Sequence, residues 1–365
     1  SSNIYVTGYY KKEEICSDIV TLKYNTNGNL DWIRSYTTTP YDGCDVGKDI
    51  DIDKNGNLYV AGVGSGFGTG SDAILLKYDT TGELKWSRRY NYNNGGDYFS
   101  KIIIDDTSRI KLIGYSYGSG LMAIYDNNGN LIKTNRFKPS NYSNVFLDFC
   151  KTDKWNNLYV SGKWLIGNSD DHDIIVLKYN SEGEILWYRI YDSENNLDDY
   201  SVGIDIDEFG DCYTIGSCKI AEPYYYIMRT LKYDRNGNLK WEASYNGEIN
   251  ICNAGGIAID SENGVYSTGA SQNNISQTGK NIVLVKYSTI LNTGQTNPNI
   301  PEKYELYQNF PNPFNPTTNI KFDISQKSFV SIKIFDILGK EISQPVNKEM
   351  NPGNYQIQWD ASNYP

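Results

Sequence analysis

The amino-acid sequence predicts an all-β fold built from repeated four-stranded antiparallel units. The main observation is a recurring phrase, LKY(N/D)xxGxLxWxRxY, whose tryptophans are Trp32, Trp86, Trp187 and Trp241, at intervals of 54, 101 and 54 residues. The interval of 101 residues contains one divergent copy, with Lys133 at the tryptophan position. A unit of about 50 residues with this pattern cannot bury its own apolar face, so its copies must stack on one another.

The composition supports a β-rich protein with many turns. Tyrosine accounts for 32 of the 365 residues, and 33 glycines supply turn positions. The formal net charge of −10 would repel a phosphate backbone, which argues against nucleic-acid binding. The sequence contains no run of about 18 apolar residues, so it predicts no membrane span.

The best-preserved copy shows four short runs of alternating apolar and polar residues. They are GKDIDID (47–53), NLYVAG (57–62), DAILLKYD (72–79) and ELKWSRRY (83–90). The first and second runs, and the third and fourth, are joined by tight turns in which glycine takes the position of positive φ. Four such strands, repeated around a ring, predict the blade of a β-propeller.

Six copies of this unit can be traced. The first copy lacks its first strand, and the sixth leaves the pattern at Ser288 before its tryptophan strand. The sequence therefore predicts a β-propeller over residues 1–290, with six visible repeats of which the first and last are incomplete. The opening SSNIYVTG matches the middle of a repeat, so we expect the chain to begin inside a longer protein, with six or seven blades in the ring.

The large repeated side chains are best interpreted as packing between blades. Along the fourth strand, Trp86 and its neighbours at every second position share one face of the sheet, where they would meet the next blade. The repeated aspartate at the head of the third strand, such as Asp72, has two interpretations. It could accept hydrogen bonds from backbone N–H groups, or it could line a calcium-rich channel. The DxxGN turns resemble the opening of an EF-hand loop only faintly, and we interpret them as hairpins.

Strand parity predicts that the short turns gather at one end of the ring and the variable loops at the other. A rigid scaffold that carries variable aromatic loops is typical of binding proteins. The same aromatic residues could also be ordinary solvated positions of a tyrosine-rich protein. The candidate ligand-binding residues are Tyr9, Tyr10, Phe67, Tyr117, Trp164, Tyr224 and Tyr225.

The single histidine defines the second candidate site. Asp170, Asp171, His172 and Asp173 are consecutive in a variable loop, and together they could bind a cation such as calcium. A solvated acidic loop is the alternative. We identify no catalytic residues, because His172 has no nucleophile motif and nothing in the sequence marks a pair of carboxylates for glycosidase chemistry.

The six cysteines form no CxxC pair, which argues against a zinc site. Cys16 and Cys44 lie in two successive loops at the variable end, and Cys218 and Cys252 occupy the same two loop types around the fifth copy. We therefore predict the disulfides Cys16–Cys44 and Cys218–Cys252, which would suit a protein outside the cytoplasm.

The repeat phrase GSDAILLKYDTTGELKWSRRY resembles a bacterial family of secreted seven-bladed propeller repeats, whose copies read roughly DAFVxKLDxxGxLxWxxxxGG. The resemblance covers about residues 1–290 and implies the propeller architecture rather than a chemistry. This chain departs from the family at the end of the fourth strand, where Arg-x-Tyr replaces the usual pair of glycines.

The segment after the repeats has two parts. Residues 291–301 form a polar linker, and residues 302–365 contain the alternating runs NIKFDI, VSIKIFDI and YQIQWD, which predict three strands of a small β-sandwich. The segments QNFPNPFNPTT, FDILGKEI and NPGNYQIQW resemble the C-terminal sorting domain of cargo of the type IX secretion system in Bacteroidetes-type bacteria. This resemblance implies the secretion machinery as a partner and a secreted or cell-surface protein. Family members continue past the WDxxxxP region, so we interpret this domain as incomplete.

Three functions remain open at this point. The leading hypothesis is a non-catalytic binding module on the cell surface, with a glycan or a protein as ligand and no cofactor other than a possible calcium ion. The second is an extracellular hydrolase or lyase of polysaccharides. The third is a structural spacer next to a catalytic domain elsewhere in the protein.

Overall fold

The computed structural model describes residues 3–12, 16–38, 44–66, 70–140, 143–167, 171–193, 197–220, 225–246, 252–272, 280–287, 303–309, 312, 316–336 and 338–362. These residues form strands and turns, and among them there is no helix long and apolar enough to cross a bilayer. The chain divides into two compact units, Ser1–Tyr287 and Ser288–Pro365.

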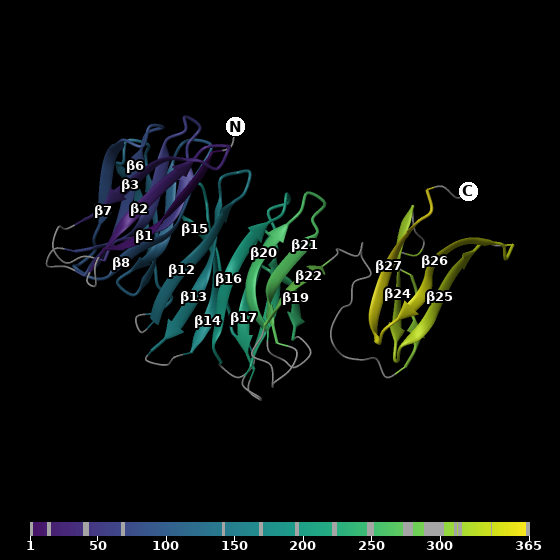
Figure 1. The fold of residues 1–365 in the computed structure, drawn as a ribbon. Helices are drawn as coiled ribbons and strands as arrows, with labels where there is room; N and C mark the ends of the chain where they lie inside the picture. The colour runs from purple at the N-terminus through teal and green to yellow at the C-terminus, as the bar shows by residue number, and fades with distance from the viewer. Residues whose placement is uncertain are drawn as a thin grey trace. The chain divides into compact units, whose positions relative to one another are not determined.

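The first unit consists of six antiparallel sheets, which we call blades 1 to 6 (Figure 1). Blade 1 contains β1 (Ile4–Lys12), β2 (Cys16–Tyr24) and β3 (Leu30–Tyr36). Blade 2 contains β4 (Val46–Ile52), β5 (Leu58–Ser65), β6 (Ser71–Tyr78) and β7 (Leu84–Tyr90). Blade 3 contains β8 (Asp97–Ile104), β9 (Ile110–Ser116), β10 (Ser119–Tyr125) and β11 (Leu131–Phe137).

The remaining blades follow the same order. Blade 4 contains β12 (Ser143–Thr152), β13 (Leu158–Ile166), β14 (His172–Tyr179) and β15 (Ile185–Tyr191). Blade 5 contains β16 (Asp199–Ile206), β17 (Cys212–Lys219), β18 (Tyr226–Tyr233) and β19 (Leu239–Tyr245). Blade 6 contains β20 (Cys252–Ile259), β21 (Val265–Ser271) and β22 (Asn281–Tyr287).

Consecutive blades pack face to face, and their first strands converge on one cavity. Residues of β4, β8, β12, β16 and β20 line this cavity, which has a volume of about 450 Å³. Strands from five different sheets can share one cavity only if the sheets are arranged about a common axis. The predicted fold class, an all-β protein with propeller-like four-stranded blades, is confirmed.

The repeated tryptophans pack between blades. The ring of Trp32 in blade 1 lies 6.3 Å from the ring of Tyr78 in blade 2. In the same way, Trp187 of blade 4 lies 6.4 Å from Tyr233 of blade 5. The divergent copy replaces this contact by an ion pair between Lys133 and Glu184 of blade 4. Aromatic side chains thus contribute to the apolar interfaces that keep a repeated tryptophan, whereas the core between blades 3 and 4 is mainly aliphatic.

Carboxylates of the first strands tie blade 2 to blade 3 and blade 5 to blade 6. Asp51 in β4 accepts a hydrogen bond from the N–H of Ile104 in β8 at 2.7 Å. Asp205 in β16 accepts the equivalent bond from the N–H of Ile259 in β20 at 2.9 Å. These bonds satisfy N–H groups on the open edge of a first strand, which have no partner in their own sheet.

The second unit is a small sandwich of two sheets, coloured yellow-green to yellow in Figure 1. One sheet contains β23 (Glu305–Leu306), β24 (Thr317–Ile324) and β27 (Gly353–Asp360), and the other contains β25 (Ser328–Phe335) and β26 (Glu341–Met350). The core comprises Phe322, Ile324, Val346, Met350 and Ile357. The sequence predicted three of these five strands and missed the two-residue β23 and also β26, which is mostly polar and contains a proline.

Candidate functional site

The two ends of the first unit differ in chemistry. At one end the turns are alike: Asp53, for example, accepts hydrogen bonds from the N–H groups of Asn55 and Asn57, both at 2.9 Å. Its carboxylate is therefore engaged by its own turn, and the hairpin interpretation of the DxxGN motif is correct. The loops at the other end, which we call the variable end, differ from blade to blade and carry the candidate side chains.

The predicted aromatic residues lie on four different blades. Tyr9 and Tyr10, near the end of β1, are exposed, and so is Tyr117 in the turn between β9 and β10. Trp164 in β13 is partly buried and packs against the cluster between blades 3 and 4. Tyr225 precedes β18, and its carbonyl accepts a hydrogen bond from the N–H of Ile220 at 2.9 Å. Phe67 and Tyr224 lie outside the described residues.

The structure instead brings together three other aromatic rings at the variable end. Tyr98 stacks on its cross-strand partner Tyr115, with ring centroids 5.5 Å apart. Tyr115 stacks in turn on Phe146 of blade 4 at 4.8 Å. Burial raises the pKa of the Tyr98 hydroxyl. The strand register is the signal that pairs Tyr98 with Tyr115, but the contact across blades has no signature in the sequence.

Among the described residues of the variable end, three carboxylates lie close together at the junction of blades 4 and 5. Asp173 is the second residue of β14, Asp192 follows β15, and Asp199 begins β16. Each contributes one carboxylate oxygen to a group in which all the oxygens lie within 4.8 Å of one another. We call these three residues the acidic cluster.

The members of the acidic cluster have different surroundings. Asp199 is fully buried and accepts hydrogen bonds from the N–H and the hydroxyl of Ser193, at 2.5 and 2.8 Å, and from the thiol of Cys218. Asp173 is 8 % exposed, and its carboxylate accepts no hydrogen bond from the described residues. Burial first, and then the nearby carboxylates of Asp192, Asp171 and Asp199, together raise the pKa of Asp173 to about 7.

The residues that the sequence predicted to bind a cation do not all belong to one cluster. Asp173 belongs to the acidic cluster, whereas Nδ1 of His172 lies 2.7 Å from an oxygen of Asp198. The other oxygen of Asp198 accepts a hydrogen bond from the hydroxyl of Tyr226 at 2.6 Å. Burial raises the pKa of Asp171, and one of its oxygens is buried without a hydrogen-bond partner.

Asp170 lies outside the described residues. Sequence reasoning missed Asp192 and Asp199, although strand parity was sufficient to find them. The end of the fourth strand and the start of the next first strand both lie at the variable end, beside the head of β14.

The second predicted disulfide, Cys218–Cys252, is wrong, because both residues carry free, buried thiols. The two side chains lie on opposite faces of blade 5: Cys218 packs in the cluster between blades 4 and 5, and Cys252 in the cluster with Ile215 and Met228. The prediction placed Cys218 in a loop, but β17 extends through it. The first predicted disulfide, Cys16–Cys44, stays a prediction. The backbone of Cys44 pairs with Ser17, next to Cys16, whose side chain is outside the described set.

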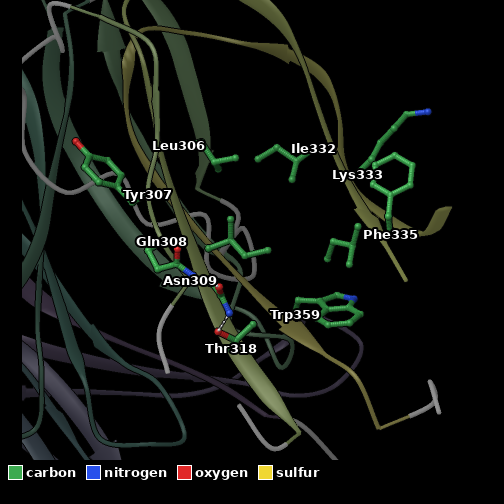
Figure 2. A pocket seen from close by; sticks show the side chains of 11 residues that line it. Leu306, Tyr307, Gln308, Asn309, Thr318, Ile332, Lys333, Phe335 and Trp359 are labelled. Carbon is green, nitrogen blue, oxygen red and sulfur yellow. Dashed lines mark hydrogen bonds between the residues drawn. The ribbon is translucent and has the colours of Figure 1, made fainter. Parts of the chain in front are cut away.

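The second unit contains a pocket of about 460 Å³ with a mostly apolar lining. Figure 2 shows the side chains of Leu306 and Ile332 pointing toward each other across it. At another side the amide of Asn309 donates a hydrogen bond to the hydroxyl of Thr318 at 3.0 Å (Figure 2). The pocket therefore lies between the two sheets of the sandwich.

Comparison with known proteins supports the division of the chain. Residues 308–365 match the secretion system C-terminal sorting domain. This match confirms the resemblance of the second unit and indicates an exported protein. A search of the curated proteins found no match.

Solved structures show the fold of the first unit. An ulvan lyase bound to -[GlcA(1-4)Rha3S]- superposes with a TM-score of 0.52 at 11 % identity, over 98 % of this chain and 90 % of that chain. A Lactobacillus plantarum protein gives 0.47 at 12 % identity, over 97 % and 99 % of the two chains. A Bacteroides caccae protein of unknown function gives 0.39 at 13 % identity, over 63 % and 78 %. This chain is thus a propeller-like protein that ends in a secretion system sorting domain.

Proposed function

We propose that this chain is exported through the type IX secretion system and acts outside the cell as a non-catalytic binding module. The sorting-domain match over residues 308–365 supports export, and the motifs QNFPNPFNPTT and NPGNYQIQW support the type IX route. The propeller-like unit would then be the cargo that the second unit delivers to the cell surface or the medium.

The observation that carries the binding function is the contrast between the two ends of the first unit. The turns at one end repeat the same self-capped aspartate, whereas the variable end presents exposed aromatic side chains, with Tyr10 63 % exposed. A tyrosine ring provides a flat apolar face and a polar hydroxyl, which together suit the face of a sugar ring. A rigid ring of sheets keeps such side chains in fixed positions before binding, which reduces the entropy cost of association.

The test measures binding of the full chain to a glycan array, followed by titration of the best ligand. Tyr9→Ala, Tyr10→Ala and Tyr117→Ala should each weaken binding about 2- to 10-fold, the effect expected for one aromatic contact. Phe209→Ala is the matched control, because Phe209 is 61 % exposed but lies in a turn at the opposite end. Equal losses for Phe209→Ala and Tyr10→Ala would contradict a ligand at the variable end.

A second candidate function is cleavage of a polysaccharide, and the arrangement around His172 favours it. Asp198 orients the imidazole of His172 and also accepts a hydrogen bond from the hydroxyl of Tyr226. A candidate base, His172, and a candidate proton donor, Tyr226, are therefore held on the same carboxylate. The fold likeness to the ulvan lyase makes acidic polysaccharides the substrates to try first. Release of new chain ends that is lost in His172→Ala would establish this function. Retained binding without release would exclude it, and inertness in both assays would favour a spacer.

A further inference from the structure

We propose that Asp173, Asp192 and Asp199 bind a calcium ion at the variable end, between blades 4 and 5. Their carboxylate oxygens come from three separate elements and lie within 4.8 Å of one another. Calcium binds oxygen ligands at about 2.3–2.6 Å, so one ion can contact a group of oxygens with this spacing. The site does not depend on the proposed function, because the ion would bind whether or not a glycan does.

An independent observation is the isolation of the Asp173 carboxylate. The residue is 8 % exposed, its carboxylate has no hydrogen bond or ion pair with the part of the chain that the structure describes, and the charges that act on it most are the carboxylates of Asp192, Asp171 and Asp199. A buried carboxylate is normally paired with a cation or with hydrogen-bond donors. Asp171 adds a further unsatisfied acceptor, because one of its carboxylate oxygens is buried without a hydrogen-bond partner. A cation in the cluster would satisfy Asp173 directly.

The equivalent position in blade 2 shows how the same chain satisfies this carboxylate elsewhere. Asp72 stands at the head of β6, as Asp173 stands at the head of β14. The guanidinium of Arg89 forms an ion pair with Asp72, and the amide of Asn91 donates a hydrogen bond to it at 2.5 Å. Blade 2 therefore neutralises its carboxylate with a protein cation and an amide.

Blade 4 has lost both of these partners. The repeat alignment places Ile190 at the position of Arg89 and Asp192 at the position of Asn91. The first change removes the cation, and the second replaces a donor by another carboxylate. Blade 3 keeps the arginine as Arg136, whose guanidinium lies 3.4 Å from the hydroxyl of Ser119. Blade 1 also lacks the arginine, but there the hydroxyl of Ser35 donates a hydrogen bond to Asp18 at 3.4 Å, whereas blade 4 gains a carboxylate instead.

The donor set selects calcium over the common alternatives. All of the ligand atoms are carboxylate oxygens, which favour hard cations, and His172 is engaged by Asp198. Asp192 is exposed, so water can complete the shell of 6–8 oxygens that calcium accepts in irregular geometry. Magnesium requires a nearly ideal octahedron, which three carboxylates on separate elements are less suited to provide. We expect a dissociation constant on the order of 10⁻⁴ M, as in extracellular calcium modules.

The experiment titrates calcium into the chelator-treated full chain by calorimetry and by terbium luminescence. Trp164 is the cross-strand partner of Asp173, so excitation of tryptophan should sensitise terbium in this site. We expect saturable binding of one ion and a rise in the thermal unfolding midpoint with calcium. Absence of both effects at millimolar calcium would overturn the proposal.

Two variants locate the ion. Ile190→Arg with Asp192→Asn rebuilds the arrangement of blade 2 and should weaken calcium binding at least 100-fold. Asp192→Asn alone changes an exposed side chain, so it should fold normally and weaken binding about tenfold, which keeps the test decisive if the double variant does not fold. Asp72→Asn is the control and should bind calcium as the unmodified chain does. Unchanged binding in Asp192→Asn would place the ion elsewhere and refute this site.

Discussion

Gly82, in the last turn of blade 2, lies directly against the indole ring of Trp32 in blade 1. A β-carbon built on Gly82 would come within 2.8 Å of that ring, and the residue has a φ of +82°. The same relationship joins Gly237 to Trp187, where the distance would be 2.7 Å. The side chain of Arg34 completes the contact by donating a hydrogen bond to the carbonyl of Gly82 at 2.7 Å. The repeated tryptophan, arginine and turn glycine therefore form one inter-blade contact.

Replacement of Gly82 by alanine should destabilise the first unit by about 2–5 kcal/mol. The positive φ costs an alanine about 1–2 kcal/mol, and the clash with Trp32 adds about 1–3 kcal/mol. Gly28→Ala is the matched control, because Gly28 has a φ of +79° but no atom within 4 Å of the added carbon. Chemical denaturation measures both variants. A loss for Gly28→Ala as large as for Gly82→Ala would show that the indole contact contributes nothing.

The buried pair of Lys111 and Asp105 should be one of the most sensitive polar contacts. The ammonium of Lys111 lies 3.1 Å from Asp105 and also donates a hydrogen bond to the carbonyl of Asn156 in blade 4 at 2.6 Å. Lys111→Met leaves a buried carboxylate unpaired and should cost about 3–5 kcal/mol. The exposed pair of Lys54 and Asp106 has a similar distance, 3.2 Å, yet Lys54→Met should cost less than about 1 kcal/mol. Denaturant unfolding measures the loss of stability in each variant. Equal losses for Lys111→Met and Lys54→Met would contradict the idea that burial makes the first ion pair more important.

Acid should weaken the turns at the end opposite the variable loops. The hydroxyl of Thr81 and the N–H groups of Glu83 and Thr81 hold the pKa of Asp79 at about 2, below its ordinary 3.8. Because the folded-state pKa is depressed, the ionised Asp79 stabilises the fold fully above its unfolded value. This contribution is lost as the pH falls from about 4 through about 2.

Thermal unfolding of Asp79→Asn tests this pH dependence. The variant should melt below the unmodified chain near about pH 6, and the difference should shrink as the pH falls from about 4 and be lost below about pH 2, where Asp79 is protonated in both the folded and the unfolded chain. Asp106→Asn is the control, since the Asp106 side chain is 82 % exposed and should show no such trend. A constant difference for Asp79→Asn across this range would contradict the assignment.

Buried thiols should resist alkylation until the protein unfolds. Burial raises the pKa of the thiols of Cys150, Cys212, Cys218 and Cys252, and only the thiolate reacts rapidly. Mass spectrometry should find these four residues unlabelled in the native chain and fully labelled after unfolding without a reductant. A Cys218–Cys252 disulfide would instead leave that pair unlabelled in both states.

The repeated fold could be predicted because its signals are local and recur. The alternation of apolar and polar residues, the turn glycines and the spacing of Trp32 and Trp86 each indicate where strands begin and end. None of these signals requires knowledge of distant contacts. The strand β26 escaped prediction because a mostly polar edge sequence with a proline carries no alternating apolar signal. Cys218 was misplaced because the end of β17 depends on pairing with its neighbours rather than on its own residues.

The site was only partly predictable, for a different physical reason. Asp173 could be singled out because it adjoins the single histidine. Its role as a cation ligand, however, depends on Ile190 and Asp192, which become its neighbours only through the register of β14 with β15. Alignment of the blades to one another, position by position, could have shown that the arginine of blade 2 is missing from blade 4. The contact with Asp199 needed the additional knowledge that blades 4 and 5 pack face to face.

The bonds from Asp51 to Ile104 and from Asp205 to Ile259 occupy equivalent places in two interfaces that are not adjacent. Blades 2 and 5 thus offer their successors the same connector, whereas Ile103 of blade 3 and Lys151 of blade 4 occupy the equivalent position. Duplication of blade 2 or of blade 5 as a whole repeat would carry this connector with it, so the first unit could gain a blade in evolution without a new kind of junction. A duplication that ended within a repeat would instead leave an aspartate without the backbone N–H group that it binds.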